Sequence, residues 1–320
     1  MRAARREAGQ GAVDEEVEQP VIRCGTPSCG AGILGHVPDQ QVPPAVEGGW
    51  TWDPTLYAGS AAYYAAGRVP YPPQIATALV AALGLDGSGR LLDVGCGPGS
   101  LTLLLAPYVA QAIGVDADAD MLTKATRLAR KQHVTNATWR HLRAEDLPAD
   151  LPHIDVVTFA QSFHWMDRDR VAAAVRALLV PGGAVVHVHA TTHQGTDTGG
   201  RLDHPQPPWA AITDLVRHYL GRQRRAGQGV LPGGTLGGEE AIYRAAGFVG
   251  PERVSVPGAT VTRTAEQVLA SVHSLSSAAP HLFGDRVGQF DADLRQLLAR
   301  ASSNGQYSEQ MGAIDLDIWR

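Results

Sequence analysis

Between residues 75 and 190, short apolar runs alternate with longer runs in which apolar residues recur at helical spacing. The short runs are nearly continuous in apolar and β-branched residues, a pattern typical of strands covered on both faces of a parallel sheet. The alternation therefore predicts an α/β fold with right-handed crossovers. The predicted strands are Arg90–Gly95, Gln111–Asp116, Ala137–Leu142, Ile154–Ala160 and Ala184–His189, and the predicted helices are Ile75–Leu83, Leu101–Val109, Asp120–Lys131 and Arg168–Leu179.

The pattern is less regular on either side of this stretch. Residues 1–48 are rich in Gly, Pro, Gln and acidic side chains without apolar periodicity, which predicts a disordered tail. Residues 191–234 are rich in Gly and Pro and predict an insertion with one short helix, Trp209–Tyr219. Pro181-Gly-Gly183 predicts a turn before the last parallel strand. The other predicted elements are helices Glu239–Ala246, Ala265–Ser276 and Asp285–Arg300 and strands Glu252–Val256 and Gly312–Trp319.

Composition and charge argue against several classes of protein. The formal net charge is −5 at pH 7, so the chain lacks the basic excess that nucleic-acid or membrane-surface binding requires. No apolar run approaches the ~18 residues that span a bilayer, and no apolar segment follows the basic start as it would in a secretory signal. Three cysteines provide no disulfide framework, which favours a reducing cytoplasm. Cys24 and Cys29 supply at most half of a zinc site, so we expect free thiols there.

The most specific chemical signal is a glycine loop between a predicted strand and a predicted helix. Gly95, Gly97 and Gly99 allow backbone with positive φ and let a ligand approach without a Cβ in the way. The spacing is G-x-G-x-G, whereas a dinucleotide-binding loop has G-x-G-x-x-G. Pro98 also removes an N–H that a diphosphate would use. The loop favours a ligand that lies along it, although a simple chain reversal or an NAD(P) site stays open at this point.

A carboxylate follows the loop at the distance expected of a ribose-binding residue. Asp116 ends the next predicted strand, about twenty residues beyond the first glycine. An acid at this position can accept hydrogen bonds from both hydroxyls of an adenosine ribose, as it does in dinucleotide folds. A solvated strand-end aspartate is the alternative, but the loop and the acid support each other.

The motifs, taken in order, resemble those of class I methyltransferases, especially the small-molecule group known as methyltransferase type 11. The resemblance covers residues 57 to 190 well and the remainder more loosely. The loop is its most specific part, and the order and spacing of the set strengthen it. The motifs are Gly67-Arg-Val-Pro-Tyr-Pro72, Asp93-Val-Gly-Cys-Gly-Pro-Gly99, Gly114-Val-Asp116, Ala144-Glu-Asp-Leu-Pro148, Phe163-His-Trp165 and Leu179-Val-Pro-Gly-Gly183.

This resemblance implies an S-adenosylmethionine-dependent enzyme with a Rossmann-like, doubly wound, mostly parallel seven-stranded sheet. The family adds an antiparallel C-terminal strand, for which Glu252–Val256 and Gly312–Trp319 are the candidate pair. Helical insertions at residues 191–234 and 264–303 are then expected to cover the substrate. The expected organisation is a single domain at residues 49–320.

The resemblance also implies cofactor contacts, residue by residue. Asp116 is expected to bind the ribose hydroxyls and Ala117 to lie beside the adenine. Gln161 is expected at the sulfonium end, while Tyr63 and Arg68 are expected to close over the cofactor carboxylate. The other implied contacts are Asp93, Gly95, Cys96, Gly97 and Gly99 along the methionine and ribose, and Ala144 and Glu145 at the edge of the adenine.

Histidines near the ends of the predicted strands are the candidates for further chemistry. His164 follows the fourth strand and could act as a general base, or it could only shape the pocket wall. His187, His189 and His193 could bind a metal, but no nearby carboxylate except Asp197 completes the set convincingly. We therefore expect buried or pocket histidines and no metal site.

The sequence predicts methyl transfer to an O, N or C atom of a small-molecule acceptor. Two alternatives remain: an NAD(P)-dependent oxidoreductase, and a non-catalytic regulator that binds the cofactor. The loop spacing weighs against the oxidoreductase. The sequence identifies neither the acceptor nor the oligomeric state.

Overall fold

The computed structural model describes residues 53–197, 199–226, 229–231 and 237–320. The predicted tail at residues 1–48, with Cys24 and Cys29, lies outside the described residues. In the part of the chain that is described, no helix is both long enough and apolar enough to cross a membrane.

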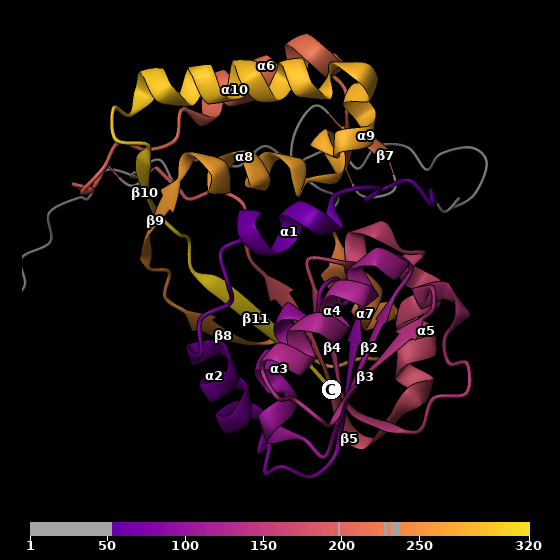
Figure 1. The fold of residues 1–320 in the computed structure, drawn as a ribbon. Coiled ribbons are helices and arrows are strands. Elements are labelled where there is room, and N and C mark those ends of the chain that lie inside the picture. Colours follow the sequence, from indigo (N-terminus) through magenta and orange to yellow (C-terminus); the bar gives the residue numbers. More distant parts are fainter. Residues whose placement is uncertain (1–52, 198, 227–228, 232–236) are drawn as a thin grey trace, which may run out of the picture. The chain divides into compact units, whose positions relative to one another are not determined.

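A seven-stranded sheet with the order β3-β2-β1-β4-β5-β11-β8 forms the centre of the fold (Figure 1). Neighbouring strands from β3 to β5 are parallel, whereas β11 is antiparallel to both β5 and β8. The predicted mostly parallel, doubly wound sheet with an antiparallel C-terminal strand is confirmed. The strands are β1 (Arg90–Val94), β2 (Gln111–Asp116), β3 (Ala137–His141), β4 (Ile154–Ala160), β5 (Leu179–His189), β8 (Glu252–Val256) and β11 (Ile314–Trp319).

The strand order reverses at β1, because the chain adds β2 and β3 on one side of it and β4 on the other. Such a reversal leaves a crevice at the carboxyl ends of the strands in open α/β sheets. Val94, Asp116 and Ala160 end β1, β2 and β4, so the segments that follow them meet at this edge.

Helices cover both faces of the sheet and bury its apolar side chains. On one face, Tyr243 of α7 and side chains of α5 pack with Phe159 and Trp319 of the sheet. On the other face, Leu79 of α2 and Leu101 of α3 pack against strand residues such as Val186. The helices that flank the sheet are α2 (Gln74–Leu83), α3 (Ser100–Leu105), α4 (Ala119–Lys131), α5 (Arg168–Leu178) and α7 (Glu239–Ala245).

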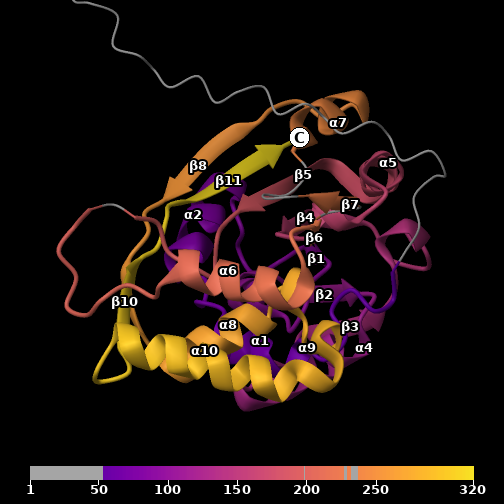
Figure 2. The ribbon, with the colours of Figure 1, turned by 90° about the horizontal axis from the view of Figure 1, so that it is seen from above.

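A second layer, which we call the helical cover, has its own apolar core, with Phe290 and Tyr307 fully buried in it. In Figures 1 and 2 the cover lies over the end of the sheet, and helix α1 (Ala61–Gly67) lies between them. The cover consists of α6 (Trp209–Leu220), β9 (Thr260–Thr264), α8 (Ala265–His273), α9 (Pro280–Phe283), α10 (Val287–Ala301) and β10 (Gln306–Gln310), with β9 and β10 paired antiparallel.

The predicted elements of the cover agree with the structure in part. Helices α8, α9 and α10 occupy the predicted insertion at 264–303, and α6 is the helix predicted at Trp209–Tyr219. Helix α8 ends at His273, three residues early, and the Ser274 hydroxyl donates to the carbonyl of Ser271. Apart from short 3-10 turns, the described elements that were not predicted are α1, α9, β9, β10 and the short pair β6 (Arg224–Ala226) and β7 (Gly229–Leu231).

The junction between α5 and β5 also differs from the prediction. Strand β5 begins at Leu179, so the predicted turn at 181–183 lies within the strand. The register between β4 and β5 shifts between Ile154 and Val156, and Gly182 has φ +83°. The glycines therefore form an irregularity in the strand and not a separate turn.

Candidate functional site

The glycine loop leaves β1 and enters α3 at the crevice of the sheet. The amides of Gly95 and Cys96 both donate to the carbonyl of Val115, at 2.8 and 3.0 Å, so the loop is tied to the end of β2. Gly97 has φ +54°, and a Cβ added to it would meet nothing within 4 Å. Gly97 therefore exposes bare backbone to open space, as close approach of a ligand requires.

Gly99, which the resemblance places along the methionine and ribose, packs closely against Trp139. Its φ of +79° ends the loop, and a Cβ there would lie 2.4 Å from the Trp139 ring and 3.3 Å from the Cβ of Ala125. A Cβ added to Gly114 would also lie too close to this indole, at 2.6 Å. Gly99 thus allows Trp139 and α4 to pack against the loop, and it lines neither of the cavities described below.

The Asp116 side chain holds the glycine loop in place by hydrogen bonds and can still accept further ones. Its Oδ2 accepts from the amide of Gly97 at 2.7 Å, and its Oδ1 accepts from the amide of Asp118 at 2.8 Å. Burial raises the pKa of Asp116 to about 6, although both amides favour the ionised form. Each carboxylate oxygen has a second lone pair, so the group can still accept from two hydroxyls.

Beneath the loop, a second aspartate is buried in the sheet. Asp93 is 1% exposed, and its two oxygens accept from the hydroxyls of Thr102 (2.6 Å) and Thr158 (2.8 Å). Burial raises the pKa of Asp93. The neighbouring thiol of Cys96 is also buried, and this burial raises its pKa.

Two cavities adjoin the loop, and Tyr64, Gly95, Gly97 and Ala160 line both. The first cavity extends along the ends of β2 and β4, and the second extends under α1. Most of the predicted cofactor residues therefore line one or other of two adjoining cavities. Of those residues, Asp116, Ala117, Ala144, Glu145 and Gln161 line the first cavity, and Arg68, Asp93 and Cys96 line the second.

Helix α1 directs a different tyrosine into the cavities from the one predicted. Tyr63 packs on His273 of the cover, with ring centroids 4.8 Å apart, whereas Tyr64 lines both cavities. Consecutive helical residues point about 100° apart, so only one of the two can face the sheet. Tyr57, which was not predicted as a contact, also lines the first cavity, and the aromatic stretch of the sequence was its only signal. Trp165 lines this cavity too, and its signal was the Phe163-His-Trp165 motif, from which a pocket wall was one expectation.

Arg68 follows α1 and joins three parts of the site. Its Nε donates to the hydroxyl of Ser274 at 2.8 Å, and its Nη2 donates to the Ser274 carbonyl at 3.0 Å. A longer hydrogen bond of 3.3 Å connects its Nη1 to the hydroxyl of Thr192. The guanidinium also lies over the Tyr64 ring, 4.8 Å from the centroid. Arg68 thus presents a positive charge at the second cavity.

Three further residues show how the end of β4 is shaped. Gln161 has φ +58°, a strained conformation for this residue, and its side-chain amide donates to the carbonyl of Val188 at 3.0 Å. Glu145 accepts from the amide of Asp167 at 2.9 Å, so it holds the next segment in place. The Trp165 indole N–H is buried and has no hydrogen-bond partner among the described residues.

His164 lies beside the site and does not line either cavity as the structure describes them. Its ring is tilted against Trp165, with centroids 4.9 Å apart. Burial lowers the pKa of His164 to about 4, and the charge of Arg168 adds to this. The predicted role as a general base stays a hypothesis.

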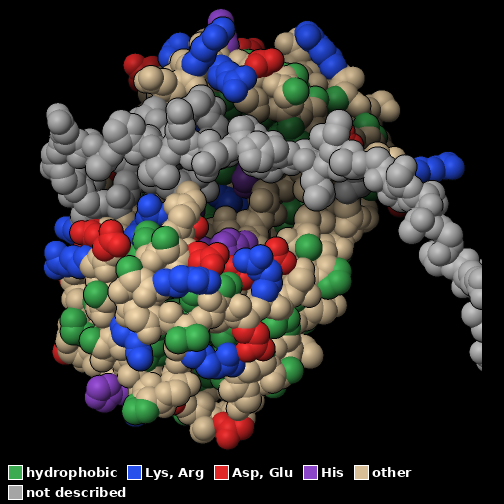
Figure 3. All heavy atoms as spheres, turned by 180° about the vertical axis from the view of Figure 1, so that it is seen from behind, with side chains coloured by type: hydrophobic (Ala, Val, Ile, Leu, Met, Phe, Trp, Pro, Cys, Tyr) green, Lys and Arg blue, Asp and Glu red, His purple; other side chains and the backbone are tan. Residues whose placement is uncertain are grey.

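The other three predicted histidines separate into a pair and a single residue. His187 and His189 stack at 4.4 Å; His187 Nδ1 lies 3.0 Å from the Tyr243 hydroxyl, and His189 Nε2 lies 3.1 Å from the Asp317 carboxylate. Histidine side chains gather in a hollow of the face seen in Figure 3. His193 lies in the loop after β5. The described residues contain no group of three or more side chains suited to hold a metal.

Comparison with known proteins agrees with this geometry. Residues 91–183 match the family model described as a methyltransferase domain. An uncharacterized methyltransferase of Mycobacterium tuberculosis is 36% identical over 132 residues, which are 41% of this chain and 51% of that protein. The ubiquinone biosynthesis O-methyltransferase of Methylococcus capsulatus is 40% identical over 98 residues, or 30% of this chain and 41% of that protein.

The chain spans about half the length of the first of these relatives. Among solved structures, the YcgJ protein of Bacillus subtilis aligns with 77% of this chain and 97% of its own, at 19% identity and a TM-score of 0.43. The strand order, the glycine loop and the family match together identify the sheet-bearing part of the chain as a class I, S-adenosylmethionine-dependent methyltransferase domain.

Proposed function

We propose that the protein transfers a methyl group from S-adenosylmethionine to an O, N or C atom of a small-molecule acceptor. The observation that carries this proposal is the Asp116 carboxylate, fixed by the amides of Gly97 and Asp118 at the junction of the loop and the first cavity. A carboxylate held in this way presents its free lone pairs to a pair of vicinal hydroxyls, as in a ribose.

The other residues of the two cavities fit the same molecule. Ala117 and Ala144 provide small, apolar walls for an adenine, and the unpartnered Trp165 N–H can donate to a ring nitrogen. In the second cavity, Arg68 provides a cation for the carboxylate of the methionine part. Tyr64 lies where the cavities meet, and its ring face suits a cationic sulfonium.

The hydrogen bonds of the loop weigh against a dinucleotide cofactor. The amides of Gly95 and Cys96 donate to Val115, that of Gly97 donates to Asp116, and that of Gly99 donates to the Cys96 carbonyl. Pro98 has no N–H. These donors are therefore engaged within the protein, whereas a diphosphate requires free N–H groups at such a loop.

When bound, S-adenosylmethionine supplies a methyl group that is already activated by the sulfonium. The protein then needs to hold an acceptor in line with that methyl and to exclude water. The helical cover lies over this end of the sheet, with α1 between them (Figure 1). Tyr64 and Ala65 of α1 line the second cavity. A covered, partly aromatic space of this kind favours a small molecule as acceptor.

Two experiments separate this proposal from its alternatives. Calorimetry with S-adenosylmethionine and with NAD distinguishes the methyltransferase from the oxidoreductase, and we expect binding of the first only. Incubation of cell extract with the protein and methyl-labelled cofactor then tests turnover, and we expect label in a small molecule. Binding without labelled product would indicate a cofactor-binding regulator, and binding of NAD alone would overturn the assignment.

A further inference from the structure

Helix α1, which supplies Tyr64 to both cavities, packs closely against helix α8 of the helical cover. A Cβ added to Gly67, the last residue of α1, would lie 2.3 Å from the carbonyl oxygen of Ala270, so the two backbones are in close contact. The hydroxyl of Ser60, just before α1, donates to the His273 carbonyl at 2.8 Å. Both ends of α1 are therefore attached to the cover.

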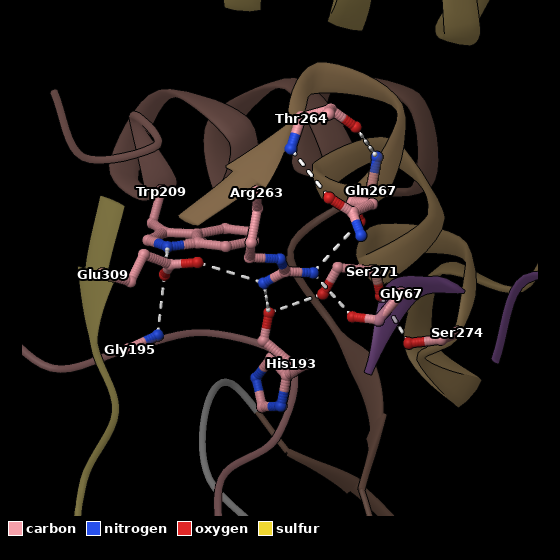
Figure 4. Close-up of polar contacts among 10 residues, drawn as sticks. All are labelled: Gly67, His193, Gly195, Trp209, Arg263, Thr264, Gln267, Ser271, Ser274 and Glu309. Atoms are coloured by element: carbon pink, nitrogen blue, oxygen red, sulfur yellow. Dashed lines mark hydrogen bonds and ion pairs between the residues drawn. The ribbon is translucent and has the colours of Figure 1, made fainter. Parts of the chain in front are cut away.

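A buried arginine of the cover strengthens this attachment. Arg263 of β9 pairs with Glu309 of β10 at 3.0 Å, and both side chains are almost completely buried. The Arg263 guanidinium donates to the carbonyls of Gly67 at 2.6 Å and of His193 at 2.8 Å (Figure 4). The backbone is thus fixed directly before Arg68, the charged residue that lines the second cavity.

Arg68 places one edge of its guanidinium on a single residue of the cover, Ser274. Its Nε donates to the Ser274 hydroxyl at 2.8 Å and its Nη2 to the Ser274 carbonyl at 3.0 Å. The hydroxyl donates its own hydrogen to the Ser271 carbonyl at 2.6 Å, so its lone pairs are turned toward Arg68. Ser274 is fully buried and caps the carboxyl end of α8, where the helix dipole favours a cation.

Two N–H groups of Arg68 remain for another partner. An arginine has five N–H donors, and the contacts to Ser274 and the longer one to Thr192 use three of them. A carboxylate accepts two such donors side by side. Burial raises the pKa of Tyr57 and Tyr71, which line the first and second cavity, and the Arg68 charge acts against this rise. The positive charge of Arg68 is therefore felt in both cavities.

We propose that Ser274 is a positioning residue for cofactor binding, which holds Arg68 so that its two remaining N–H groups bind the carboxylate of S-adenosylmethionine. This inference rests on the proposed function. It divides the cofactor site between two layers, with the adenosine on the sheet at Asp116 and the amino-acid end on α1 and the cover. Only a ligand with an intact amino-acid end connects the two layers.

The arrangement gives Ser274 an effect on affinity although it does not touch the cofactor. A free arginine side chain loses rotamer freedom when it binds a ligand, and a side chain fixed in advance loses less. The hydroxyl of Ser274 is not needed to hold α1 against α8, because Ser60, Gly67 and Arg263 also make that contact. We therefore expect Ser274→Ala to fold and to bind adenosine normally.

Calorimetry with two ligands tests the proposal without any acceptor. S-Adenosylhomocysteine has the amino-acid end of the cofactor, whereas 5′-methylthioadenosine has the same nucleoside and no carboxylate. The wild type should bind S-adenosylhomocysteine about a hundredfold more tightly. Ser274→Ala should lower the affinity for S-adenosylhomocysteine about tenfold and change that for 5′-methylthioadenosine less than about twofold.

A double-variant cycle separates positioning from a structural role. Arg68→Met should lower the affinity for S-adenosylhomocysteine about a hundredfold, because it removes the cation. Ser274→Ala should cause no further loss in the Arg68→Met background, since Ser274 acts only through Arg68. Additive losses of affinity in the double variant would overturn the proposal.

The matched control is Ser302→Ala. Ser302 is also a buried serine that caps the carboxyl end of a cover helix, α10, and its hydroxyl contacts Asn304 and Gln306. This variant should bind both ligands like the wild type. An equal loss for both ligands in Ser274→Ala, or wild-type affinity for S-adenosylhomocysteine in that variant, would overturn the proposal.

The wild type alone separates failure of this inference from failure of the proposed function. Equal affinity for 5′-methylthioadenosine and S-adenosylhomocysteine would show that the amino-acid end is not bound, which overturns the role of Ser274 and leaves the adenosine site in place. Binding of neither ligand, nor of S-adenosylmethionine, would overturn the proposed function and this inference with it.

Discussion

We expect Asp116 to couple cofactor binding to pH. Its pKa is raised to about 6 by burial, so the carboxylate becomes protonated as the pH falls through that value. A protonated acid loses acceptor capacity toward ribose hydroxyls. The affinity for S-adenosylmethionine should therefore fall about tenfold between pH 7.5 and pH 5, as calorimetry can measure. The pKa values of His164 and His193, about 4 and about 3, lie below this window.

Two variants isolate the role of this carboxylate. In Asp116→Asn, the amide NH2 must face the N–H of either Gly97 or Asp118, so most affinity and its pH dependence should be lost. Asp120→Asn changes an exposed aspartate in the first turn of α4, and it should leave the affinity for S-adenosylmethionine and the pH dependence of that affinity unchanged. A wild-type affinity that stays constant down to pH 5 would contradict the assignment of Asp116.

Gly97 and Gly99 both have positive φ, but their replacement by alanine should affect different properties of the protein. At either position, alanine in a backbone of positive φ should lower the free energy of unfolding by about 1–2 kcal/mol. Gly99→Ala also drives a Cβ to 2.4 Å from Trp139, and such overpacking adds about 1–3 kcal/mol. Gly97→Ala meets open space and should instead weaken cofactor binding by about tenfold or more. Urea unfolding and calorimetry measure the two effects, and equal losses of stability would contradict the distinction.

The contrast between these glycines shows how far the sequence could predict the site. The spacing placed Asp116 beside the loop, as the structure does, because this spacing follows from the length of one strand–helix–strand unit. The ribose contact itself stays a prediction. The packing of Trp139 on Gly99 was not visible, because it depends on how two strands lie side by side. The choice of Tyr64 over Tyr63 depends on the rotation of α1, which the sequence pattern did not specify.

At the level of elements, the buried pair Arg263–Glu309 connects the ribbon β9–β10 to the rest of the protein (Figure 4). Arg263 donates to the carbonyls of Gly67 and Gln267, in addition to His193. Arg263→Met and Glu309→Met should each lower the free energy of unfolding by about 3–5 kcal/mol, because each variant leaves a buried charge without its partner. The double variant should cost less than the sum, as measured by urea unfolding.

The exposed pair Arg295–Glu266 provides the matched control. Its Nε–Oε1 distance of 2.8 Å is similar to that of the buried pair, but both side chains are about half exposed or more. Arg295→Met should therefore lower the free energy of unfolding by less than about 1 kcal/mol. Additive losses at residues 263 and 309 would show that the two buried charges do not depend on each other.

The sequence predicted most elements of the sheet because each strand has a continuous apolar run and each helix a clear periodicity. Strand β9 was missed although Thr260-Val-Thr-Arg-Thr264 is rich in β-branched residues. Its partner β10 begins 42 residues after it ends, and a pairing over such a distance leaves no local signal. Helix α1 is short and consists of Ala, Tyr and Gly, so its pattern did not distinguish it from a loop.

At the level of the whole molecule, two apolar clusters lie on the faces of the sheet, and a third lies within the cover. Elements with separate cores often open as separate cooperative units. We therefore expect amides of α6 and α10 to exchange hydrogen faster than those of β4 and β5 under native conditions. Mass spectrometry of peptides from these elements measures the difference. Equal protection of α10 and β4 would show that the sheet and the cover unfold together.

Addition of S-adenosylmethionine extends this test to the cavities between the two layers. A ligand that binds only the closed arrangement stabilises it by about 2.7 kcal/mol at a concentration of 100 Kd. The added protection should be largest in α1 and in residues 192–196, because these segments contact both the cavities and the cover. Protection confined to residues 95–118 would indicate that the cofactor is held by the sheet alone, and that the cover closes only over the acceptor.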